Sequence, residues 1–196
     1  MKTSLRLIGG EKIKSPNSNK TRPTTLMARE AIFNILSSEV EDSNWLDLFS
    51  GSGSVSCEAY NHGAKKIVAV EKDRTNAELC KKNLFSLKDA SIRKNDIEII
   101  CKDVFSWLKL CRNKKLLVEE TNNQNDQFDF IYIDPPYKEN YFELLLNQLF
   151  LSDFIKENTL IIYEHSKLNE IKNSPLWQIS DIRLYGQTKL TFLIKV

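Results

Sequence analysis

The sequence predicts an α/β protein built on one doubly wound, mostly parallel sheet of seven strands. Five short apolar segments between residues 45 and 165 alternate with segments of helical periodicity. This alternation is typical of parallel strands covered by helices on both faces. Two further apolar segments, 178–186 and 189–196, are separated only by a short turn around Gly186, which predicts an antiparallel hairpin at one edge of the sheet.

The N-terminal part is predicted to contribute a small hairpin and a helix. Short apolar runs flank a Gly-Gly pair in 5–14, and such a pair suits a two-residue turn with positive φ. Apolar residues recur at helical spacing in 22–38, where Thr24 or Thr25 is placed to cap the helix. The segment between them is a predicted loop.

The alternating region follows in chain order. Strands are expected at 45–50, 66–72, 97–103, 128–134 and 159–165. Helices are expected at 54–63, 74–87, around Phe105, Trp107 and Leu108, at 140–150, and from the fifth strand to Pro175. The polar, Asn-rich segment 112–127 is predicted to be a surface loop.

Length and charge indicate how the chain is divided into a domain and an arm. With 196 residues, 41% of them hydrophobic, it suits one domain, which we place at 23–196, with an N-terminal arm over 1–22. The formal net charge is +2, but residues 1–30 alone carry seven Lys and Arg against two Glu. A basic arm on an otherwise mildly acidic chain indicates a polyanionic partner such as nucleic acid, although a solvated basic tail fits the charge equally well.

Composition argues against several other classes. We expect a cytoplasmic protein that does not engage membranes, because the sequence shows neither a long apolar span nor a signal peptide. The four cysteines form no CxxC pair and are accompanied by only two histidines, so no metal site is expected. The cysteines are interpreted as reduced and structural.

A glycine-rich turn and two acidic strand ends indicate a nucleoside-binding crevice. Asp47, Gly51 and Gly53 lie between the first core strand and its helix, where glycine lets the backbone approach a ligand. Glu71 ends the next strand, where a carboxylate can accept hydrogen bonds from both ribose hydroxyls. Asp103 ends the third strand and is placed to reach an adenine amino group.

The details of the turn favour S-adenosylmethionine over a dinucleotide. Ser56 stands where the dinucleotide fingerprint has its last glycine, and no Lys-Ser/Thr pair of a phosphate-binding loop is present. Asp47 would repel a phosphate but suits the ammonium group of an amino acid. Asp47 could equally accept hydrogen bonds from loop N–H groups, and the two roles are compatible.

The segment "DPPY" follows the fourth predicted strand. Pro135 keeps Asp134 extended, and neither Pro135 nor Pro136 has an N–H, so carbonyl acceptors are presented without competing donors. This suits the exocyclic amine of a nucleobase, held by the Asp134 carboxylate and the Pro135 carbonyl. Tyr137 offers a face on which a flipped base can stack. A Pro-rich turn is the simpler alternative, but the preceding glycine turn favours a functional site.

The motifs "DLFSGSGS" and "DPPY" together resemble the class I S-adenosylmethionine-dependent methyltransferases that modify amino groups. With "RLIGG", "RPTT", "REAIFNIL" and a terminal "YGQTKLTFL", the resemblance narrows to the RsmD family and covers nearly the whole chain. It implies a Rossmann-like methyltransferase fold and methylation of the N2 amine of a guanine in small-subunit (16S) ribosomal RNA. Leu26 departs from the family pattern, which usually has Asp there.

The site residues assigned on this basis fall into three sets. Cofactor binding is assigned to Asp47, Phe49, Gly51, Gly53, Glu71, Asp103 and Val104. Amine positioning is assigned to Asp134, Pro135, Pro136 and Tyr137. RNA binding is assigned to Arg6, Lys12, Lys14, Arg22 and Arg29. We expect a monomer that acts on ribosomal RNA within a small-subunit particle.

Three other functions are compatible with parts of the sequence. An adenine-N6 DNA methyltransferase uses the same tetrapeptide, but no separate DNA-recognition domain is evident in 196 residues. A protein-glutamine methyltransferase would be expected to carry Asn in place of Asp134. A non-catalytic RNA-binding module on a methyltransferase fold is disfavoured because Glu71 and Asp134 are intact.

Overall fold

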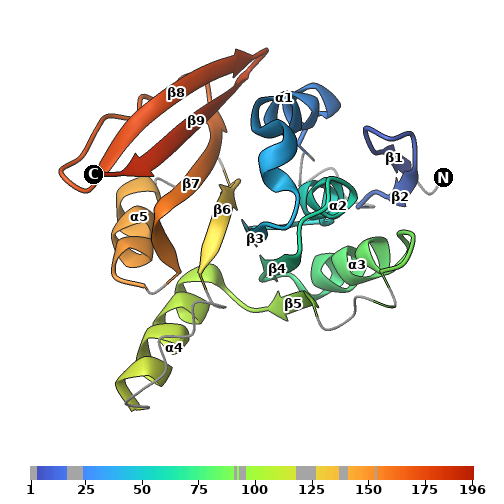
Figure 1. Cartoon of the computed structure of the whole chain (residues 1–196), viewed down its shortest axis with the longest axis horizontal. Coiled ribbons are helices and arrows are strands. Elements are labelled where there is room, and N and C mark those ends of the chain that lie inside the picture. Colours follow the sequence, from blue (N-terminus) through green and yellow to red (C-terminus); the bar gives the residue numbers. More distant parts are fainter. Residues whose placement is uncertain are drawn as a thin grey trace.

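The computed structural model describes residues 4–16, 24–90, 92, 96–117, 127–136, 141–152 and 154–196. Its main sheet is formed by β3 (Asn44–Leu48), β4 (Lys66–Glu71), β5 (Ile97–Cys101), β6 (Phe128–Ile133), β7 (Ile155–Ser166), β8 (Trp177–Tyr185) and β9 (Thr188–Lys195). The strand order is β5-β4-β3-β6-β7-β9-β8 (Figure 1). The first five strands are parallel, and β9 runs antiparallel to β7 and β8. The predicted fold class is therefore confirmed.

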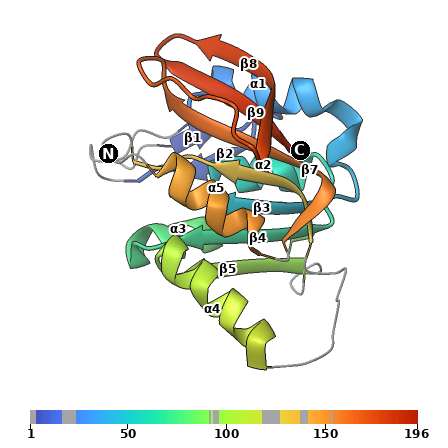
Figure 2. The same cartoon turned by 90° about the vertical axis from the view of Figure 1, so that its left-hand side faces the viewer.

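Helices cover both faces of this sheet. The helices are α1 (Leu26–Leu36), α2 (Ser54–Asn61), α3 (Arg74–Leu84), α4 (Val104–Leu117) and α5 (Phe142–Phe150), and the 3-10 turn η1 (Ser37–Val40) follows α1. α1, α2 and α3 lie on one face, and α4 and α5 on the other (Figures 1 and 2). Successive residues of a strand point to opposite faces of the sheet. Trp45 therefore packs in the hydrophobic core with α1, α2 and α3, while Leu46 and Leu48 pack in the core with α4 and α5.

Of the two threonines that could cap α1, Thr25 does so. The Thr25 hydroxyl accepts a hydrogen bond from the Ala28 N–H at 3.2 Å, which satisfies one of the free donors of the first turn. Thr24 lies just outside the helix with its side chain buried, and its role is in the site described below.

Two predicted segments differ from the structure. The expected helix between the fifth parallel strand and Pro175 is wrong: residues 167–176 form turns and irregular chain. This segment has too few apolar residues to make a buried stripe, and Leu168 is 82% exposed. Conversely, α4 runs on through 112–117, which was predicted to be loop, because this stretch is rich in residues of high helix propensity.

The N-terminal hairpin consists of β1 (Ser4–Arg6) and β2 (Lys12–Lys14), paired antiparallel. Five residues join the strands, rather than the predicted two, and the Leu7 N–H donates to the Glu11 carbonyl at 2.8 Å to close the loop. Leu7 and Ile13 are buried in the core with α1, α2 and α3. The predicted hairpin is thus confirmed, and its apolar side is docked on the body of the protein.

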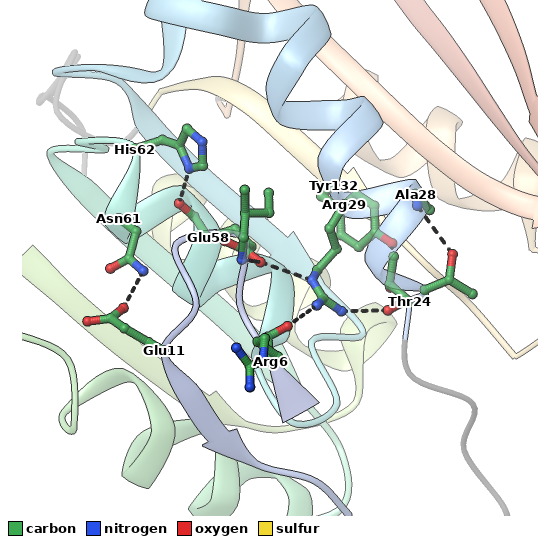
Figure 3. Close-up of polar contacts among 11 residues, drawn as sticks. Arg6, Glu11, Thr24, Ala28, Arg29, Glu58, Asn61, His62 and Tyr132 are labelled. Atoms are coloured by element: carbon green, nitrogen blue, oxygen red, sulfur yellow. Dashed lines mark hydrogen bonds and ion pairs between the residues drawn. The ribbon is translucent and has the colours of Figure 1, made fainter. Parts of the chain in front are cut away.

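A buried ion pair fixes the hairpin against α1 and α2. Arg29 Nε lies 3.1 Å from Glu58 Oε1, and the two side chains are 1% and 0% exposed. The other guanidinium nitrogens donate to the carbonyls of Arg6 and Thr24, each at 2.7 Å (Figure 3). Glu58 also accepts from the Ile8 N–H at 3.0 Å. One guanidinium therefore joins three parts of the chain that are distant in sequence.

Within the described ranges, no helix combines the length and apolarity needed to cross a membrane.

Arg29→Ala should lower the free energy of unfolding by about 3–5 kcal/mol, because it leaves the Glu58 carboxylate buried without its cation. Urea unfolding followed by circular dichroism measures this change. The matched control is Arg74→Ala, which removes an ion pair to Glu78 whose side chains are 88% and 57% exposed, and which should cost less than about 0.5 kcal/mol. Equal costs for the two variants would contradict the assigned role of the buried pair.

Candidate active site

The parallel strands bring the predicted acidic residues to one edge of the sheet. β5, β4, β3 and β6 are neighbours with parallel register, so their carboxyl ends lie together. Glu71 ends β4, Asp103 follows β5 and Asp134 follows β6, while the glycine turn follows β3. In open α/β sheets, ligands bind at this edge where strand order reverses, which here is between β3 and β6.

The glycine turn is held by Glu71. One carboxylate oxygen accepts from the Gly51 N–H at 2.9 Å, and the other accepts from the Asp73 N–H at 2.7 Å. Phe49, Gly51 and Gly53 all have positive φ, at 66°, 54° and 75°. Each Glu71 oxygen has a further lone pair, so these bonds leave acceptor capacity for ligand hydroxyls.

Gly53 also has a packing role. A Cβ at this position would lie 2.5 Å from the Cys80 Sγ on α3, which no side chain can accommodate without a shift. The close approach of α3 to the start of α2 therefore requires glycine independently of any ligand. At Gly51 the nearest atom to such a Cβ is the Phe49 carbonyl oxygen at 4.0 Å, so space is not the constraint there.

Asp47 is a buried carboxylate with one unpaired oxygen. It is 1% exposed, and the Ser56 hydroxyl donates to its Oδ2 at 2.5 Å. Its Oδ1 has no hydrogen-bond partner among the residues that the structure describes. Burial, with a smaller contribution from the nearby Glu71 charge, raises the pKa of Asp47 to about 7. An ammonium donor next to Oδ1 would satisfy this oxygen and favour the charged carboxylate, which fits the predicted cofactor.

Three further residues that were predicted to bind the cofactor, Asp103, Val104 and Phe49, have different surroundings. Asp103 Oδ1 accepts from the Ser106 N–H at 3.0 Å at the start of α4, and the carboxylate keeps further lone pairs for a ligand. The Val104 side chain is buried in the core, which leaves its backbone to face a ligand. Phe49 stacks on Tyr141, with ring centroids 6.2 Å apart, and borders the turn with an aromatic surface.

Asp134 is half-buried at the end of β6. Its N–H lies 3.5 Å from the Leu48 carbonyl oxygen of β3, which places it beside the glycine turn. Pro135 is buried and Pro136 is exposed. Burial raises the pKa of Asp134 well above its ordinary value, and the Glu164 and Asp47 charges raise it further. Tyr137 lies outside the described residues.

Three residues beside Asp134 were not assigned to the site from the sequence. The Thr24 hydroxyl lies 2.9 Å from the Tyr132 hydroxyl and 3.5 Å from Asp134 Oδ2. The Tyr132 hydroxyl in turn donates a short hydrogen bond to Glu164. The available signal was Glu164 itself, an acidic residue following the apolar run of a parallel strand, as Asp134 does.

The predicted RNA-binding residues do not share one environment. Arg6, Lys12 and Lys14 are exposed on the hairpin, with Arg6 paired opposite Lys12 across the strands. Arg22 lies outside the described residues. The prediction for Arg29 is wrong, because its guanidinium is buried and bonded to Glu58 and two carbonyls, so it cannot reach a phosphate.

A cavity of about 840 Å³ opens next to this edge of the sheet. It lies between α5, the end of β7 and residues 169–177, and its lining includes Phe142, Tyr163 and His165. Burial, with a smaller contribution from the Asp134 charge, raises the pKa of Tyr163 to about 12. Tyr163 pairs across the sheet with Ile133, the residue before Asp134. Across the described ranges, no group of three or more His, Cys, Asp and Glu side chains is placed to hold a metal ion.

The strand order, glycine turn and acidic strand ends define the class I methyltransferase fold. Comparison with known proteins assigns the chain to one family within this class. The family model described as "Conserved hypothetical protein 95" matches residues 5–194, and the chain belongs to this family of RsmD-type methyltransferases.

Named relatives agree with this assignment. The chain is 32% identical over 170 residues to the ribosomal RNA small subunit methyltransferase D of Haemophilus influenzae, covering 87% of this chain and 81% of that protein. The Escherichia coli K12 protein of the same name is 27% identical, with 93% and 86% covered. The structure of a putative methylase from Haemophilus influenzae is 28% identical, has a TM-score of 0.74 and is matched over 99% of both chains.

Asp47→Asn should stabilise the ligand-free protein at neutral pH. The folded state keeps the Asp47 proton up to about pH 7, while the unfolded state releases it near 3.8, so stability falls as pH rises through this window. Asn keeps an acceptor for Ser56 without a charge, and the gain at pH 7 is at most about 4 kcal/mol. Urea unfolding at pH 5 and pH 7 measures it. A variant no more stable than the parent at pH 7 would contradict the unpaired burial of Asp47.

Proposed function

We propose that the protein transfers a methyl group from S-adenosylmethionine to the N2 amine of a guanine in small-subunit ribosomal RNA. The observation that carries this proposal is the position of Asp134 and Pro135 beside the glycine turn, at the carboxyl edge of the sheet. The names of the relatives support ribosomal RNA as the substrate class. The reaction belongs in the cytoplasm, on a small-subunit particle, with the protein acting as a monomer.

The cofactor half of the site rests on Asp47 and Glu71. Bound S-adenosylmethionine supplies an electrophilic methyl group on a sulfonium. The Asp47 Oδ1, which no side chain or backbone group of the described ranges contacts by a hydrogen bond, would accept from the ammonium of the methionine part. Glu71 would accept from the ribose hydroxyls with the lone pairs that Gly51 and Asp73 leave free. The Asp103 carboxylate and the Val104 backbone would complete the adenine side.

The amine half of the site rests on Asp134 and the two prolines. The exocyclic nitrogen of guanine is a weak nucleophile because its lone pair is delocalised into the ring. Acceptance of its hydrogens by the Asp134 carboxylate and the Pro135 carbonyl turns the lone pair toward the methyl group. Methylation gives the nitrogen positive charge, and Asp134 then stabilises that charge and receives the proton.

Next to these two halves, the proposed RNA-binding surface combines charge and shape. Arg6, Lys12 and Lys14 form the exposed cationic face of the hairpin, which would hold phosphates and orient the RNA. The cavity lined by Phe142, Tyr163 and residues 169–177 has room for a nucleotide and lies beside β7, the neighbour of β6 in the sheet. We therefore retain 1–22 as the RNA-binding arm and 23–196 as the methyltransferase domain.

Glu71→Ala should weaken S-adenosylmethionine binding about tenfold or more, because a charge-assisted hydrogen bond contributes roughly 1.5–3 kcal/mol. Calorimetric titration of the purified protein measures the affinity. Glu78→Ala is the control, since Glu78 is 57% exposed on α3 and forms an exposed ion pair with Arg74. Thermal unfolding of both variants verifies that they are folded. Unchanged affinity in Glu71→Ala would remove Glu71 from the cofactor site.

Asp134→Asn should lower the methylation rate about 100- to 1,000-fold, the cost typical of losing one electrostatic stabiliser of developing charge. Asn keeps the shape and one acceptor oxygen but carries no charge. The measurement is single-turnover methyl transfer at saturating ribosomal RNA, with a parallel titration of the cofactor.

Cofactor affinity should stay close to that of the parent protein, because Asp134 faces the base. A near-normal rate would make "DPPY" a structural turn. A loss of cofactor binding would instead move Asp134 into the cofactor site. Methyl transfer to adenine in DNA, but not to ribosomal RNA, would support the DNA methyltransferase, and no transfer at all would support the non-catalytic module.

A further inference from the structure

The buried side chain of Asn83 on α3 joins the N-terminal hairpin to the glycine turn. Its Oδ1 accepts a hydrogen bond from the Lys14 N–H, and its Nδ2 donates to the carbonyl oxygens of Lys14 and Ser52, each at 2.9 Å. Asn83 is 1% exposed. Lys14 ends β2, which lies beside α3 (Figure 1), and Ser52 lies in the glycine turn between Gly51 and Gly53. One amide therefore contacts both the cationic hairpin and the turn of the cofactor site.

The orientation of the Asn83 amide is fixed by these two partners together. A carbonyl oxygen accepts but cannot donate, so the two Nδ2 hydrogens must point at the carbonyls of Lys14 and Ser52, and Oδ1 must face the Lys14 N–H. A reversed amide would set an oxygen against two carbonyl oxygens and leave the Lys14 N–H without this acceptor. Such unsatisfied groups are costly when buried, so each partner of Asn83 favours the orientation that the other needs.

The glycine turn is braced from two sides. Glu71 of β4 accepts from the Gly51 N–H at 2.9 Å, and Asn83 of α3 donates to the Ser52 carbonyl from the other side. α3 comes so close to the turn that a Cβ at Gly53 would lie 2.5 Å from a sulfur on this helix. That sulfur belongs to Cys80, three residues before Asn83 and on the same face of the helix. The helix face that carries Asn83 is therefore packed directly against the turn.

We propose that Asn83 is a positioning residue that couples the hairpin to the cofactor site. The inference rests on the proposed function, in which the hairpin holds RNA and the turn holds S-adenosylmethionine. A bound cofactor would fix the Ser52 carbonyl toward Asn83, and the fixed amide then favours both contacts to Lys14. The two states are a hairpin docked on α3 and a hairpin released from it.

The coupling acts in both directions. RNA that holds the hairpin in its docked position would fix the same amide and, through it, the Ser52 carbonyl of the turn. Coupling free energies between two binding sites are reciprocal, so RNA must raise the affinity for the cofactor by the same factor as the cofactor raises the affinity for RNA. The exposed Lys14 side chain is thereby held at a fixed position relative to the methyl donor.

Another asparagine provides a matched control. The Asn61 Nδ2 donates to Glu11 Oε2 at 2.6 Å, so it also attaches the hairpin to the body of the protein (Figure 3). Asn61 is exposed at the last position of α2, at the end of this helix away from the glycine turn. Asn61→Ala should therefore loosen the hairpin without acting on the turn.

Hydrogen exchange of the Leu7 amide, measured by NMR, tests the coupling without RNA. This amide reports on the hairpin because it donates to the Glu11 carbonyl within the hairpin loop. In the parent protein, saturating S-adenosylhomocysteine should slow its exchange about fivefold or more, the low end of typical coupling between two sites. Asn61→Ala should speed the exchange but keep this ratio. Asn83→Ala, at the same multiple of its own dissociation constant, should abolish the slowing.

Asn83→Asp is a second variant that keeps the shape of the side chain. It retains an acceptor for the Lys14 N–H but cannot donate to the Ser52 carbonyl, so it should also lose the coupling. A purely structural asparagine predicts lower thermal stability in both variants with the same ligand-induced slowing as in the parent, and that result would overturn the proposal. Unchanged Leu7 exchange in the ligand-bound parent protein would overturn it too, whether or not either variant folds.

A titration with RNA separates this inference from the proposed function. In the parent protein, saturating small-subunit ribosomal RNA should raise the affinity for labelled S-adenosylhomocysteine about fivefold or more, and in Asn83→Ala the affinity should not depend on RNA. RNA that is bound and methylated without any effect on cofactor affinity would overturn the coupling and leave the proposed function intact. Slowing of hairpin exchange by the cofactor product, without any methylation of RNA, would sustain the coupling and reject the proposed function.

Discussion

The clustering of carboxylates at one edge of a parallel sheet is the constraint on which the rest of the structure depends. Parallel strands must end on the same side, so Asp47, Glu71, Asp134 and Glu164 are brought together by topology. Like charges that are removed from water cannot all stay ionised at low cost. Each carboxylate therefore needs a backbone donor, a hydroxyl, a proton or a ligand cation.

The four carboxylates meet this need in different ways. Glu71 accepts from two backbone N–H groups and holds the glycine turn in its conformation. Asp47 has one hydroxyl donor and one unpaired oxygen, which makes it the group most in need of a cation. Asp134 and Glu164 are joined through two hydroxyls. The burial of like charges that disfavours the ligand-free state thus suits the site to a cationic cofactor and to the amine of the proposed substrate.

The N-terminal segment is part of this site. Thr24, which contacts Asp134, precedes α1, and its carbonyl is fixed by the buried Arg29. Arg29 also holds the carbonyl of Arg6 on the cationic hairpin. The proposed RNA-binding surface and the amine-positioning carboxylate are therefore tied to the same guanidinium, which explains why an arginine in this segment has a structural role.

Much of the fold was predictable because local and global signals agree. Short apolar strands that alternate with helices leave few topologies, and Thr25 caps α1 as its sequence position allows. The helix predicted over 167–176 was wrong, because Pro175 suggested a helix end although no apolar stripe supports a helix there. The predicted two-residue turn of the hairpin was also wrong, because the hydrogen bond from the Leu7 N–H to the Glu11 carbonyl sets a longer loop than the Gly-Gly pair suggests.

The positions of Asp134 and Glu71 were predictable, because both stand at strand ends close to a distinctive glycine turn, and the structure has them there. It was not predictable where a residue acts through the tertiary fold. Nothing in the local sequence distinguishes a buried Arg29 from an exposed RNA contact, because its partner Glu58 lies on another helix. Thr24 likewise reaches Tyr132 only because the sheet places β6 beside the N-terminal segment.

The most direct test of the central claim is to map methylated nucleotides in ribosomal RNA from cells with and without the gene. If the protein has the proposed function, one N2-methylguanine in the small-subunit RNA disappears when the gene is deleted. Expression of the parent protein should restore it, and expression of Asp134→Asn should not. An unchanged small-subunit methylation pattern, or the loss of a methyl group at another chemical position, would contradict the account.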